Sequence, residues 1–429
     1  MVKRNRIKKT LKFSLLEGIF TSCMVGLTTD YFTPYALVLK ATVRQIGALS
    51  AVPFLASSLA QLRSAEITEK FGSRRKTITV FVFLHALMLI PIMLIPHLFK
   101  THQVLFLILF VTLFTALNTL ATPVWSSLMA EYIPYKMRGR YFGWRNKIMS
   151  IIIIVFSLAS GFILHFFQTS VLKGFTIIFI IAFLSRIISW YFLTRMYESP
   201  FKPDKSAYFG VLDFIKNIRS SNFVRFVLFV AGLQFCVNLA SPFFSVFMLR
   251  DLKFDYITYT VTVTTVTVVQ ILTLGRWGRC ADITGNVKVL KFTGLVIASL
   301  PLWWIISQNR PYLIFAQALS GFAWAGFNLC TGNFVYDAVT PQKRIRCIAY
   351  LSVFVGMAVF LGGIAGGYLA AMLPDLFGYK LLTLFLISSA LRFLAVMTLS
   401  RKVNEVRAIH KMKSKDLALS VIGIRSIPR

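Results

Sequence analysis

Twelve long apolar stretches, separated by short polar segments, dominate the chain. Each one supplies about the 20 mostly apolar residues that a helix needs to cross a bilayer. The predicted helices are 13–36, 45–66, 77–97, 103–130, 143–167 and 174–195, followed by 222–248, 254–274, 288–308, 311–337, 348–373 and 379–399. The pattern therefore predicts an all-α membrane protein with twelve transmembrane helices.

One of these stretches also carries the signature of a β-strand. From Thr258 to Val269, threonine alternates with β-branched apolar residues, which is typical of strands. An open strand cannot cross lipid, because its backbone groups would lack hydrogen-bond partners there. The threonine hydroxyls can bond to the preceding helical turn instead, so we predict a helix.

Composition supports a membrane location, and the distribution of charge argues against nucleic acid as a partner. Apolar residues make up 57% of the chain and charged residues only 14%, against about 25% in soluble domains. The formal net charge of +32 would suggest nucleic acid binding in a soluble chain. Here the basic residues lie in short segments between apolar stretches, as they do in membrane proteins.

The positions of lysine and arginine predict the orientation. If the N-terminus is cytoplasmic, the inward segments carry 36 of these residues and the outward loops carry eight. Cytoplasmic loops normally hold the excess. We therefore expect a multi-pass protein of the inner (plasma) membrane with both termini in the cytoplasm.

The longest internal polar segment divides the chain. We predict an N-terminal six-helix bundle at 1–195, a cytoplasmic linker with a surface helix at 196–221, and a C-terminal six-helix bundle at 222–400. The basic tail at 401–429 is read either as a segment along anionic lipid or as a solvated tail.

The two halves repeat each other at nearly constant spacing. Glu131 and Asp337 are 206 residues apart and follow matched helices, and the same spacing separates Arg138 from Arg344. The ends of the first and seventh helices and the loops after the second and eighth match at spacings of 208 and 213. Because each half holds an even number of helices, we expect a parallel repeat about an axis along the membrane normal.

In these features the chain resembles the major facilitator superfamily, over nearly its whole length. The most specific motif is a loop with a small residue, an acid, a glycine and basic residues, present as Gly278, Asp282, Gly285 and Lys288. The first half departs from it, with Ala65 in place of the first glycine. The matching residues there are Glu69, Gly72, Arg74, Arg75 and Lys76.

The resemblance implies that the motif forms a gate, in which the acid anchors a neighbouring helix and steadies an outward-open state. A carboxylate is stabilised near a helix N-terminus or an arginine, and the glycine permits a tight turn. The alternative is a generic basic loop. The expected gating set is Glu69, Gly72, Arg74, Arg75, Gly278, Asp282, Gly285, Lys288, Glu131, Arg138, Asp337 and Arg344.

Acidic residues within the first helix are candidates for function, since ionisable groups in membrane helices usually face a cavity. Asp30 lies near the outer end beside Pro34, where an unwound turn would expose backbone carbonyls. We expect it to contact substrate or a coupling ion, or else to be an interfacial acid paired with Lys40 or Arg44. Glu17 is read as the structural partner of an arginine on the cytoplasmic side.

Polar and aromatic side chains on three helices form the second candidate set. The resemblance implies that helices 1, 4, 7 and 10 line a central cavity, where amide and indole groups bind a polar substrate. The alternative is hydrogen bonding between helices. The candidates are Asn118, Trp125, Gln234, Asn238, Trp324, Asn328 and Asn333.

Three other intramembrane residues carry open alternatives. His85 is either a proton carrier or, more commonly for a lone histidine, a packing residue. Arg186 and Arg392 occupy the sixth helix of each half, and snorkelling, pairing and anion binding are all open for them. Glycines in the eleventh helix permit either close packing or bending.

These patterns predict a secondary transporter or facilitator that moves a small solute by alternating access. The sequence has no nucleotide-binding loop, no nucleophile with a base, and no metal or cofactor motif, so we do not expect an enzyme. A coupling ion, proton or sodium, is left open, and we expect a monomer. The alternatives are a non-transporting sensor or assembly partner and a lipid or lysolipid transporter.

Overall fold

A computed structural model describes residues 2–198, 221–339 and 341–406, apart from the side chains of 2–5, 135–136, 138–140 and 341–346. The greater part of the predicted linker, 199–220, and of the predicted tail, 407–429, lies outside the described residues. The chain forms two compact units. The first comprises Met1–Lys205 with Met248–Thr260, and the second comprises Ser206–Phe247 with Val261–Arg429.

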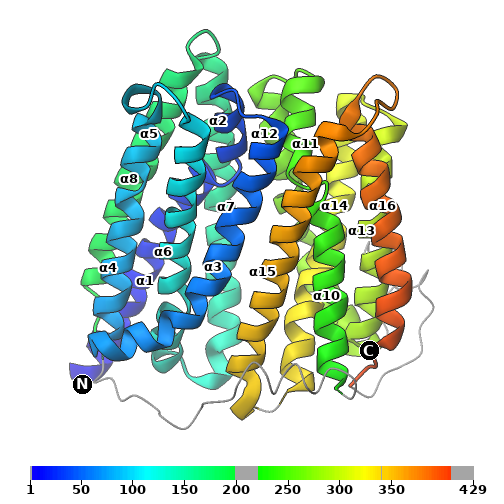
Figure 1. The fold of residues 1–429 in the computed structure, drawn as a ribbon. Coiled ribbons are helices and arrows are strands. Elements are labelled where there is room, and N and C mark those ends of the chain that lie inside the picture. Colours follow the sequence, from blue (N-terminus) through cyan, green and yellow to red (C-terminus); the bar gives the residue numbers. More distant parts are fainter. Residues whose placement is uncertain (1, 199–220, 340, 407–429) are drawn as a thin grey trace. The chain divides into compact units, whose positions relative to one another are not determined.

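Long helices build both units (Figure 1). The first half of the chain contains α1 (Val2–Thr28), α2 (Phe32–Val38), α3 (Val43–Phe71), α4 (Arg74–Leu87), α5 (Leu89–Leu98), α6 (Gln103–Tyr132), α7 (Tyr135–Phe166) and α8 (Val171–Thr194). The second contains α10 (Asn222–Asn238), α11 (Phe243–Val246), a π-helical turn (Phe247–Asp251), α12 (Tyr256–Thr284), α13 (Asn286–Ile306), α14 (Arg310–Ala338), α15 (Pro341–Met372), α16 (Lys380–Leu399) and a final 3₁₀ turn (Ser400–Lys402).

Twelve segments of the described chain are long and apolar enough to span a membrane, which confirms the predicted number. The threonine-rich stretch is helical as predicted, within α12. Thr265 donates a hydrogen bond to the carbonyl of Val261, four residues earlier in its own helix, whereas Thr260 shares a hydrogen bond with the hydroxyl of Tyr31.

Several helices extend beyond their predicted ends. Helix α7 begins at Tyr135 rather than at 143, and α12 continues to Thr284 rather than 274. The prediction stopped where the apolar pattern stopped, but arginine and lysine are good helix formers and prolong a helix beyond the apolar core. As a result, Gly278 and Asp282 lie within a helix and not in a loop.

Three spans are interrupted. The first breaks at Thr29–Tyr31 between α1 and α2, and the third breaks at Met88, ahead of Pro91. The seventh breaks after Asn238 and resumes beyond Pro242. A proline lacks the backbone N–H and crowds the preceding turn. Pro91 and Pro242 therefore explain the interruptions of the third and the seventh span.

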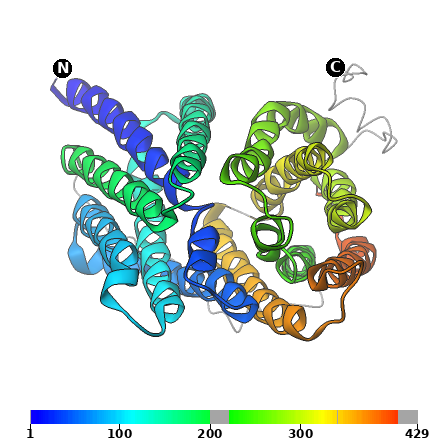
Figure 2. The ribbon, with the colours of Figure 1, turned by 90° about the horizontal axis from the view of Figure 1, so that it is seen from above.

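The same pairs of helices pack together in each unit. In the first, α1 packs against α7 and α8, and α4 against α6 and α8. In the second, α10 packs against α15 and α16, and α13 against α14 and α16. Seen end-on, each unit is a bundle of nearly parallel helices (Figure 2). The internal repeat read from the sequence is therefore also a repeat of helix packing.

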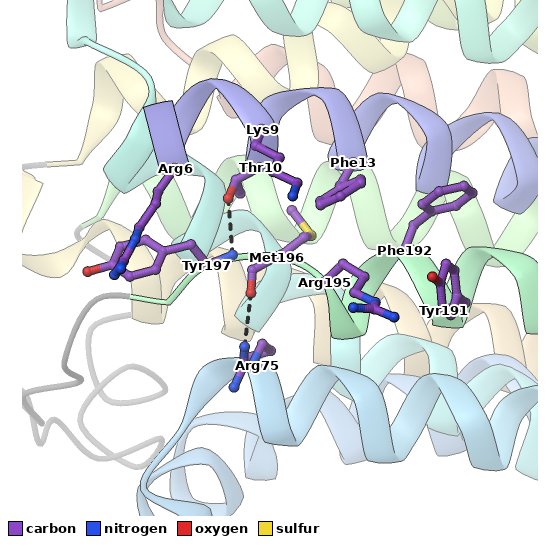
Figure 3. Close-up of a pocket in the computed structure, with 10 residues that line it drawn as sticks. All are labelled: Arg6, Lys9, Thr10, Phe13, Arg75, Tyr191, Phe192, Arg195, Met196 and Tyr197. Atoms are coloured by element: carbon purple, nitrogen blue, oxygen red, sulfur yellow. Dashed lines mark hydrogen bonds between the residues drawn. The ribbon is translucent and has the colours of Figure 1, made fainter. Parts of the chain in front are cut away.

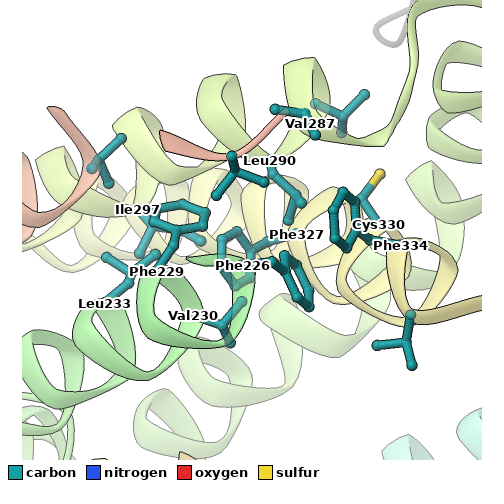
Figure 4. Close-up of a cluster of buried hydrophobic side chains, with 14 of the residues drawn as sticks. Phe226, Phe229, Val230, Leu233, Val287, Leu290, Ile297, Phe327, Cys330 and Phe334 are labelled. Carbon is teal, nitrogen blue, oxygen red and sulfur yellow. The ribbon is translucent and has the colours of Figure 1, made fainter. Parts of the chain in front are cut away.

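Aromatic and aliphatic side chains fill the interior of the second unit (Figure 4). Phe226 of α10 stacks on Phe334 of α14 with ring centroids 4.3 Å apart, and both rings are fully buried. Phe229 meets Phe327 edge-to-face farther along the same two helices. This dry core holds α10, α13 and α14 together, and so fixes where the polar faces of these helices point.

Candidate transport site

Arg186, on α8, is the centre of a buried polar network in the first unit. Only 2% of its surface is exposed. Its guanidinium donates hydrogen bonds to Thr21 at 2.6 Å, to Asn118 at 2.9 Å and to His85 Nδ1 at 3.0 Å. A longer bond of 3.4 Å reaches Ser189. The network thus joins α1, α4 and α6 to α8. Of the open alternatives for Arg186, the structure shows hydrogen bonding to neighbouring helices and not snorkelling toward the membrane surface.

His85 receives that hydrogen bond on Nδ1, so this nitrogen carries no proton and the ring is the neutral Nε2–H tautomer. The ring is 1% exposed and stacks on Phe114 with centroids 3.9 Å apart. In this structure His85 is a packed side chain that orients the arginine.

Glu17 forms an ion pair with Arg145 of α7 at 3.1 Å. Both side chains are largely buried, and Arg145 also lies over the ring of Trp125 of α6 at 4.5 Å. Gly18 makes this approach feasible, since a Cβ there would lie 2.3 Å from Arg145 Nη2. The expectation that Glu17 pairs with an arginine matches this geometry.

Thr21 connects the two arginines. Its hydroxyl accepts from Arg186 and donates to Glu17 Oε1 at 2.9 Å. The connected network therefore contains two guanidinium groups and one carboxylate, so it holds one excess positive charge among the described residues. Such a centre stabilises negative charge or the negative end of a dipole brought near it.

Two hydrogen-bond donors at this centre have no partner in the described part of the chain. These are Trp125 Nε1 and Arg145 Nε, both buried. Tyr141 Oη, on α7 like Arg145, and Ser14 Oγ, whose backbone carbonyl accepts from Arg145, are further buried polar atoms without a partner among the described residues. An unpaired buried donor costs about 1–3 kcal/mol, so such groups in native proteins usually meet water or a ligand.

The predicted cavity residues on α6 and α14 occupy equivalent faces of the two helices. On α6 the polar face runs from Asn118 through the exposed Thr122 and Ser126. On α14 the positions 206 residues later are Trp324, the exposed Asn328 and Gly332, with Asn333 beside them. Residues four apart lie on the same helix face. The side chains of α6 therefore form one polar stripe, and those of α14 form a stripe of an indole and amides at the equivalent positions.

The amides of α10 are partly engaged with each other. Asn238 donates to the backbone carbonyl of Gln234 at 2.9 Å and to its side-chain oxygen at 3.4 Å. Asn238 is the last residue of α10, just before the break in the seventh span. Both side chains are half-buried.

Arg392, the counterpart of Arg186 in the second unit, is bound differently. It is 2% exposed and donates to the backbone carbonyls of Ile297 and Val237, each at 3.1 Å, and to Ser388. None of these partners is a carboxylate. Arg392 thus ties α16 to α13 and α10 through their backbones.

Asp30 lies in the predicted unwound turn between α1 and α2 and is half-buried. Its backbone carbonyl accepts a hydrogen bond from Tyr259 at 2.8 Å, within the first unit. Its carboxylate makes no ion pair with another residue that the structure describes, so the expected alternative pairing with Lys40 or Arg44 is not seen.

The gating set of the first unit meets at the start of α4. Arg74 forms an ion pair with Glu131, at the end of α6, at 2.5 Å. Arg75 donates to the carbonyl of Met196 at 3.2 Å. Gly72 ends α3 with φ +61°, a left-handed conformation that a glycine adopts without strain. Glu69 is exposed on the last turn of α3, and no ion pair of it is found in residues 2–198, 221–339 and 341–406.

The second unit repeats this arrangement with different chemistry. Asn286, at the start of α13, donates to Asp337 at the end of α14 at 2.7 Å, where the first unit has the Arg74–Glu131 ion pair. Gly285 has φ +83°, matching Gly72. Gly278 and Lys288 are half-buried and Asp282 is exposed. The side chains of Arg138 and Arg344 lie outside the described residues.

The sequence reading missed three residues at these sites. Arg145 lies two residues inside the predicted start of its helix at 143 and is one of the 36 basic residues that the orientation places on the cytoplasmic side. Glu198 and Glu405 accept hydrogen bonds from the first backbone N–H groups of α4 and α13. Their spacing of 207 residues matches the repeat and could have revealed them.

Twelve apolar helices in two units with repeated packing and repeated polar contacts define a polytopic transport protein of the membrane. A model of the Major Facilitator Superfamily matches residues 18–246 and 226–426. The chain belongs to this superfamily, whose members are secondary transporters of small solutes.

Solved structures share the fold. A nucleoside transporter, NupG, matches with a TM-score of 0.69 at 15% identity, over 93% of this chain and 99% of that one. A D-xylose–proton symporter matches with a TM-score of 0.72 at 14% identity, over 95% and 99%. A bacterial homologue of the iron transporter ferroportin, in an inward-facing state, gives 0.69 at 13% identity, over 94% and 99%. No curated protein sequence matches the chain.

Proposed function

We propose that this transporter moves a small polar solute bearing acceptor oxygens, such as a carboxylate, phosphate, carbonyl or hydroxyl compound. The buried centre of Trp125, Arg145 and Arg186 contacts the solute or positions the groups that do. The observation that carries this proposal is the pair of buried donors without partners, Trp125 Nε1 and Arg145 Nε. Acceptor oxygens are the groups that satisfy them.

The excess positive charge of the network favours the same class of solute. Glu17 neutralises one of the two guanidinium groups, and the neutral His85 adds no charge. A solute with negative or partly negative oxygens therefore approaches a centre of favourable potential in a medium where charge is weakly screened. A purely apolar solute would gain nothing from these donors, which separates this proposal from a lipid-tail site.

The polar stripes of α6 and α14 are the further groups proposed for recognition, each within its own unit. In this proposal Asn118 anchors one stripe to Arg186, while Trp324, Asn328 and Asn333 offer an indole and two amides on the other. Gln234 and Asn238 contribute at the break in the seventh span. Amide and indole groups fix the orientation of a polar solute through hydrogen bonds and stacking.

The remaining assignments complete the proposal. Asp30 serves as the coupling carboxylate for a proton or sodium ion, and the acidic and basic residues at the starts of α4 and α13 serve as the gate. The transporter works as a monomer of two six-helix bundles, 1–195 and 222–400, joined by the linker 196–221 and followed by the tail 401–429. It lies in the inner membrane with both termini in the cytoplasm.

Uptake into proteoliposomes tests the solute class. The purified protein is reconstituted and offered radiolabelled monocarboxylates, sugar phosphates, nucleosides and sugars at varied pH and sodium concentration. For any solute taken up, Trp125→Phe keeps an aromatic ring against Arg145 and removes the N–H donor together with the second ring of the indole. We expect it to raise KM by about fivefold to tenfold, the effect of one lost hydrogen bond to a charged or polar group.

Trp144→Phe is the matched control, since Trp144 is an exposed indole on α7 next to the same centre. It should leave KM unchanged. Equal kinetics for the two tryptophan variants would remove this centre from the solute path.

A further inference from the structure

A cavity lies in the first unit, apart from the polar network. It has a volume of about 540 Å³ and is bordered by the start of α1, the start of α4 and the end of α8 (Figure 3). Four of its lining residues are cations, namely Arg6, Lys9, Arg75 and Arg195. Four are aromatic, namely Phe13, Tyr191, Phe192 and Tyr197. Among the residues that the structure describes, the lining contains no acid.

Three of the cations lie over aromatic rings. The Arg6 guanidinium is 5.6 Å from the centre of the Tyr197 ring, and that of Arg195 is 5.0 Å from the Tyr191 ring. Lys9 Nζ is 5.7 Å from the Phe13 ring. Such contacts orient a cation without neutralising it, so its charge stays available to an anion.

None of the four cations forms an ion pair in the part of the chain that the structure describes. Glu198 follows Tyr197 directly, but its carboxylate is directed to Ser73 and to the backbone of Arg74. Arg75 uses one N–H on the carbonyl of Met196, which is a neutral partner. The cavity thus collects four positive charges with no compensating acid among these residues.

The floor of the cavity is fixed by hydrogen bonds. Thr10 accepts from the backbone N–H of Tyr197 at 3.0 Å, which holds the chain after α8 against α1. Tyr132 of α6 donates to the carbonyl of Tyr197. These bonds and the one from Arg75 hold the segment after α8 in place, and Figure 3 shows the four cations lining the cavity from α1, α4 and the end of α8.

We propose that this cavity binds a phosphate-bearing anion, either the headgroup of an anionic phospholipid or a free phosphate compound, at a site separate from the solute path. A phosphate matches arginine well, because the planar guanidinium can donate two parallel hydrogen bonds to it. Aromatic side chains at the same level suit the membrane interface, where an apolar body and a polar end are both satisfied.

The experiment compares two variants that remove equal charge from the full-length protein. The test variant is Arg6→Gln/Lys9→Gln/Arg195→Gln. The control is Lys8→Gln/Lys12→Gln/Arg401→Gln, which takes two exposed lysines from the same helix and the arginine that corresponds to Arg195 in the second unit. Arg75 is left intact because it belongs to the proposed gate.

Native mass spectrometry of protein released from nanodiscs tests for a bound lipid headgroup. In discs of phosphatidylcholine with a minor share of phosphatidylglycerol, we expect wild type and control to retain phosphatidylglycerol selectively. Near a membrane surface each basic residue is worth roughly fivefold in affinity for anionic lipid. The test variant should therefore lose at least about tenfold in retained phosphatidylglycerol.

Thermal unfolding in a neutral detergent tests for a free phosphate compound. The probes are inorganic phosphate and pyrophosphate, in a sulfate-free buffer of constant ionic strength. If the ligand is a free phosphate compound, pyrophosphate raises the Tm of wild type and control but not of the test variant. Selective lipid retention with no response to these probes assigns the lipid headgroup.

Equal phosphatidylglycerol retention and equal Tm shifts in test and control variants would overturn the proposal. The absence of a response in both experiments, lipid retention and thermal unfolding, would overturn it as well. A further variant, Arg195→Lys with Arg6→Lys, keeps the charge and guards against misfolding. It loses the paired N–H donors but keeps the charge, so it should bind more weakly than wild type and more strongly than the test variant. A loss as large as that of the test variant would count against a contribution from charge.

Discussion

The Glu198 carboxylate accepts a hydrogen bond from the backbone N–H of Arg74 at 2.6 Å and caps the start of α4. Its other oxygen accepts from the Ser73 hydroxyl at 2.6 Å. In the second unit, Glu405 accepts from the backbone N–H of Val287 at 2.8 Å. In both units, therefore, an acid that follows the last helix of the repeat stabilises the N-terminus of the third helix.

Replacing Glu198 by glutamine should destabilise the first unit. The amide keeps one acceptor oxygen but places an N–H₂ group where the second acceptor was, and it removes the charge from the helix N-terminus. We expect a loss of about 1–2 kcal/mol in the free energy of unfolding, seen as a lower Tm in detergent. Glu66→Gln is the control, since its pairs with Arg63 and Lys70 are exposed and contribute little.

A drop in Tm as large for Glu66→Gln as for Glu198→Gln would show that charge alone, and not the cap, matters. The same comparison in transport assays separates gating from stability. If the cap only stabilises the fold, the rate of solute uptake per folded molecule should be unchanged.

Close packing of α15 on α10 depends on glycine. A Cβ at Gly366 would lie 2.2 Å from the backbone oxygen of Leu239, and one at Gly362 would lie 2.4 Å from that of Phe235. The first unit has a similar contact, where Gly26 of α1 lies against the backbone of Ile153 in α7. The sequence left close packing and bending open for the glycines of this helix. Gly362 and Gly366 serve close packing.

Gly366→Ala should therefore separate the two helices and destabilise the protein by about 1–3 kcal/mol, because the obstacle is backbone and cannot rotate away. Gly275→Ala on α12 is the control, since nothing lies within 4 Å of its Cβ position. There the better helix propensity of alanine should stabilise by up to about 1 kcal/mol. Thermal unfolding of both variants in the same detergent shows whether each substitution lowers or raises the Tm. Two stabilised variants would contradict the packing argument.

Membrane physics explains how much of the fold the sequence could predict. Twelve apolar runs require twelve spanning helices, since lipid leaves the backbone no other partner, and this held even for the strand-like Thr258–Val269. Helix ends were less predictable. The ends of α7 and α12 lie beyond the apolar runs, where composition no longer distinguishes helix from loop and the helix continues through arginine-rich turns.

The candidate site was less accessible to sequence reasoning, because its geometry depends on which helices meet. Arg186 was recognised as an intramembrane charge, but its contacts with His85, Thr21 and Asn118 join residues far apart in the chain. Hydropathy does not specify such pairings. Arg145 was assigned to the loop side because a charge near a helix end looks the same whether it points to water or to a buried carboxylate.

Arg186→Lys should weaken the polar network despite keeping its charge. Lysine has a single donating nitrogen and cannot reach His85, Thr21 and Asn118 together, so buried acceptors lose partners. We expect a loss of about 2–4 kcal/mol in unfolding free energy, read from thermal or denaturant unfolding. Arg63→Lys, at an exposed ion pair, should change stability by less than about 0.5 kcal/mol. Equal effects of the two substitutions would contradict the structural role of Arg186.

Asp30→Asn should uncouple transport without abolishing it. The half-buried carboxylate of Asp30 has no ion-pair partner among the residues that the structure describes, so it can accept a proton or bind sodium, and asparagine can do neither. We expect solute exchange across proteoliposomes at equal ion concentrations to continue within about threefold of wild type, while accumulation driven by a proton or sodium gradient is lost. Asp375→Asn, at an exposed position outside the predicted spans, is the control and should keep both activities. Gradient-driven accumulation that survives in Asp30→Asn would exclude Asp30 as the coupling group, because only a group that changes its own occupancy can link the solute to the ion.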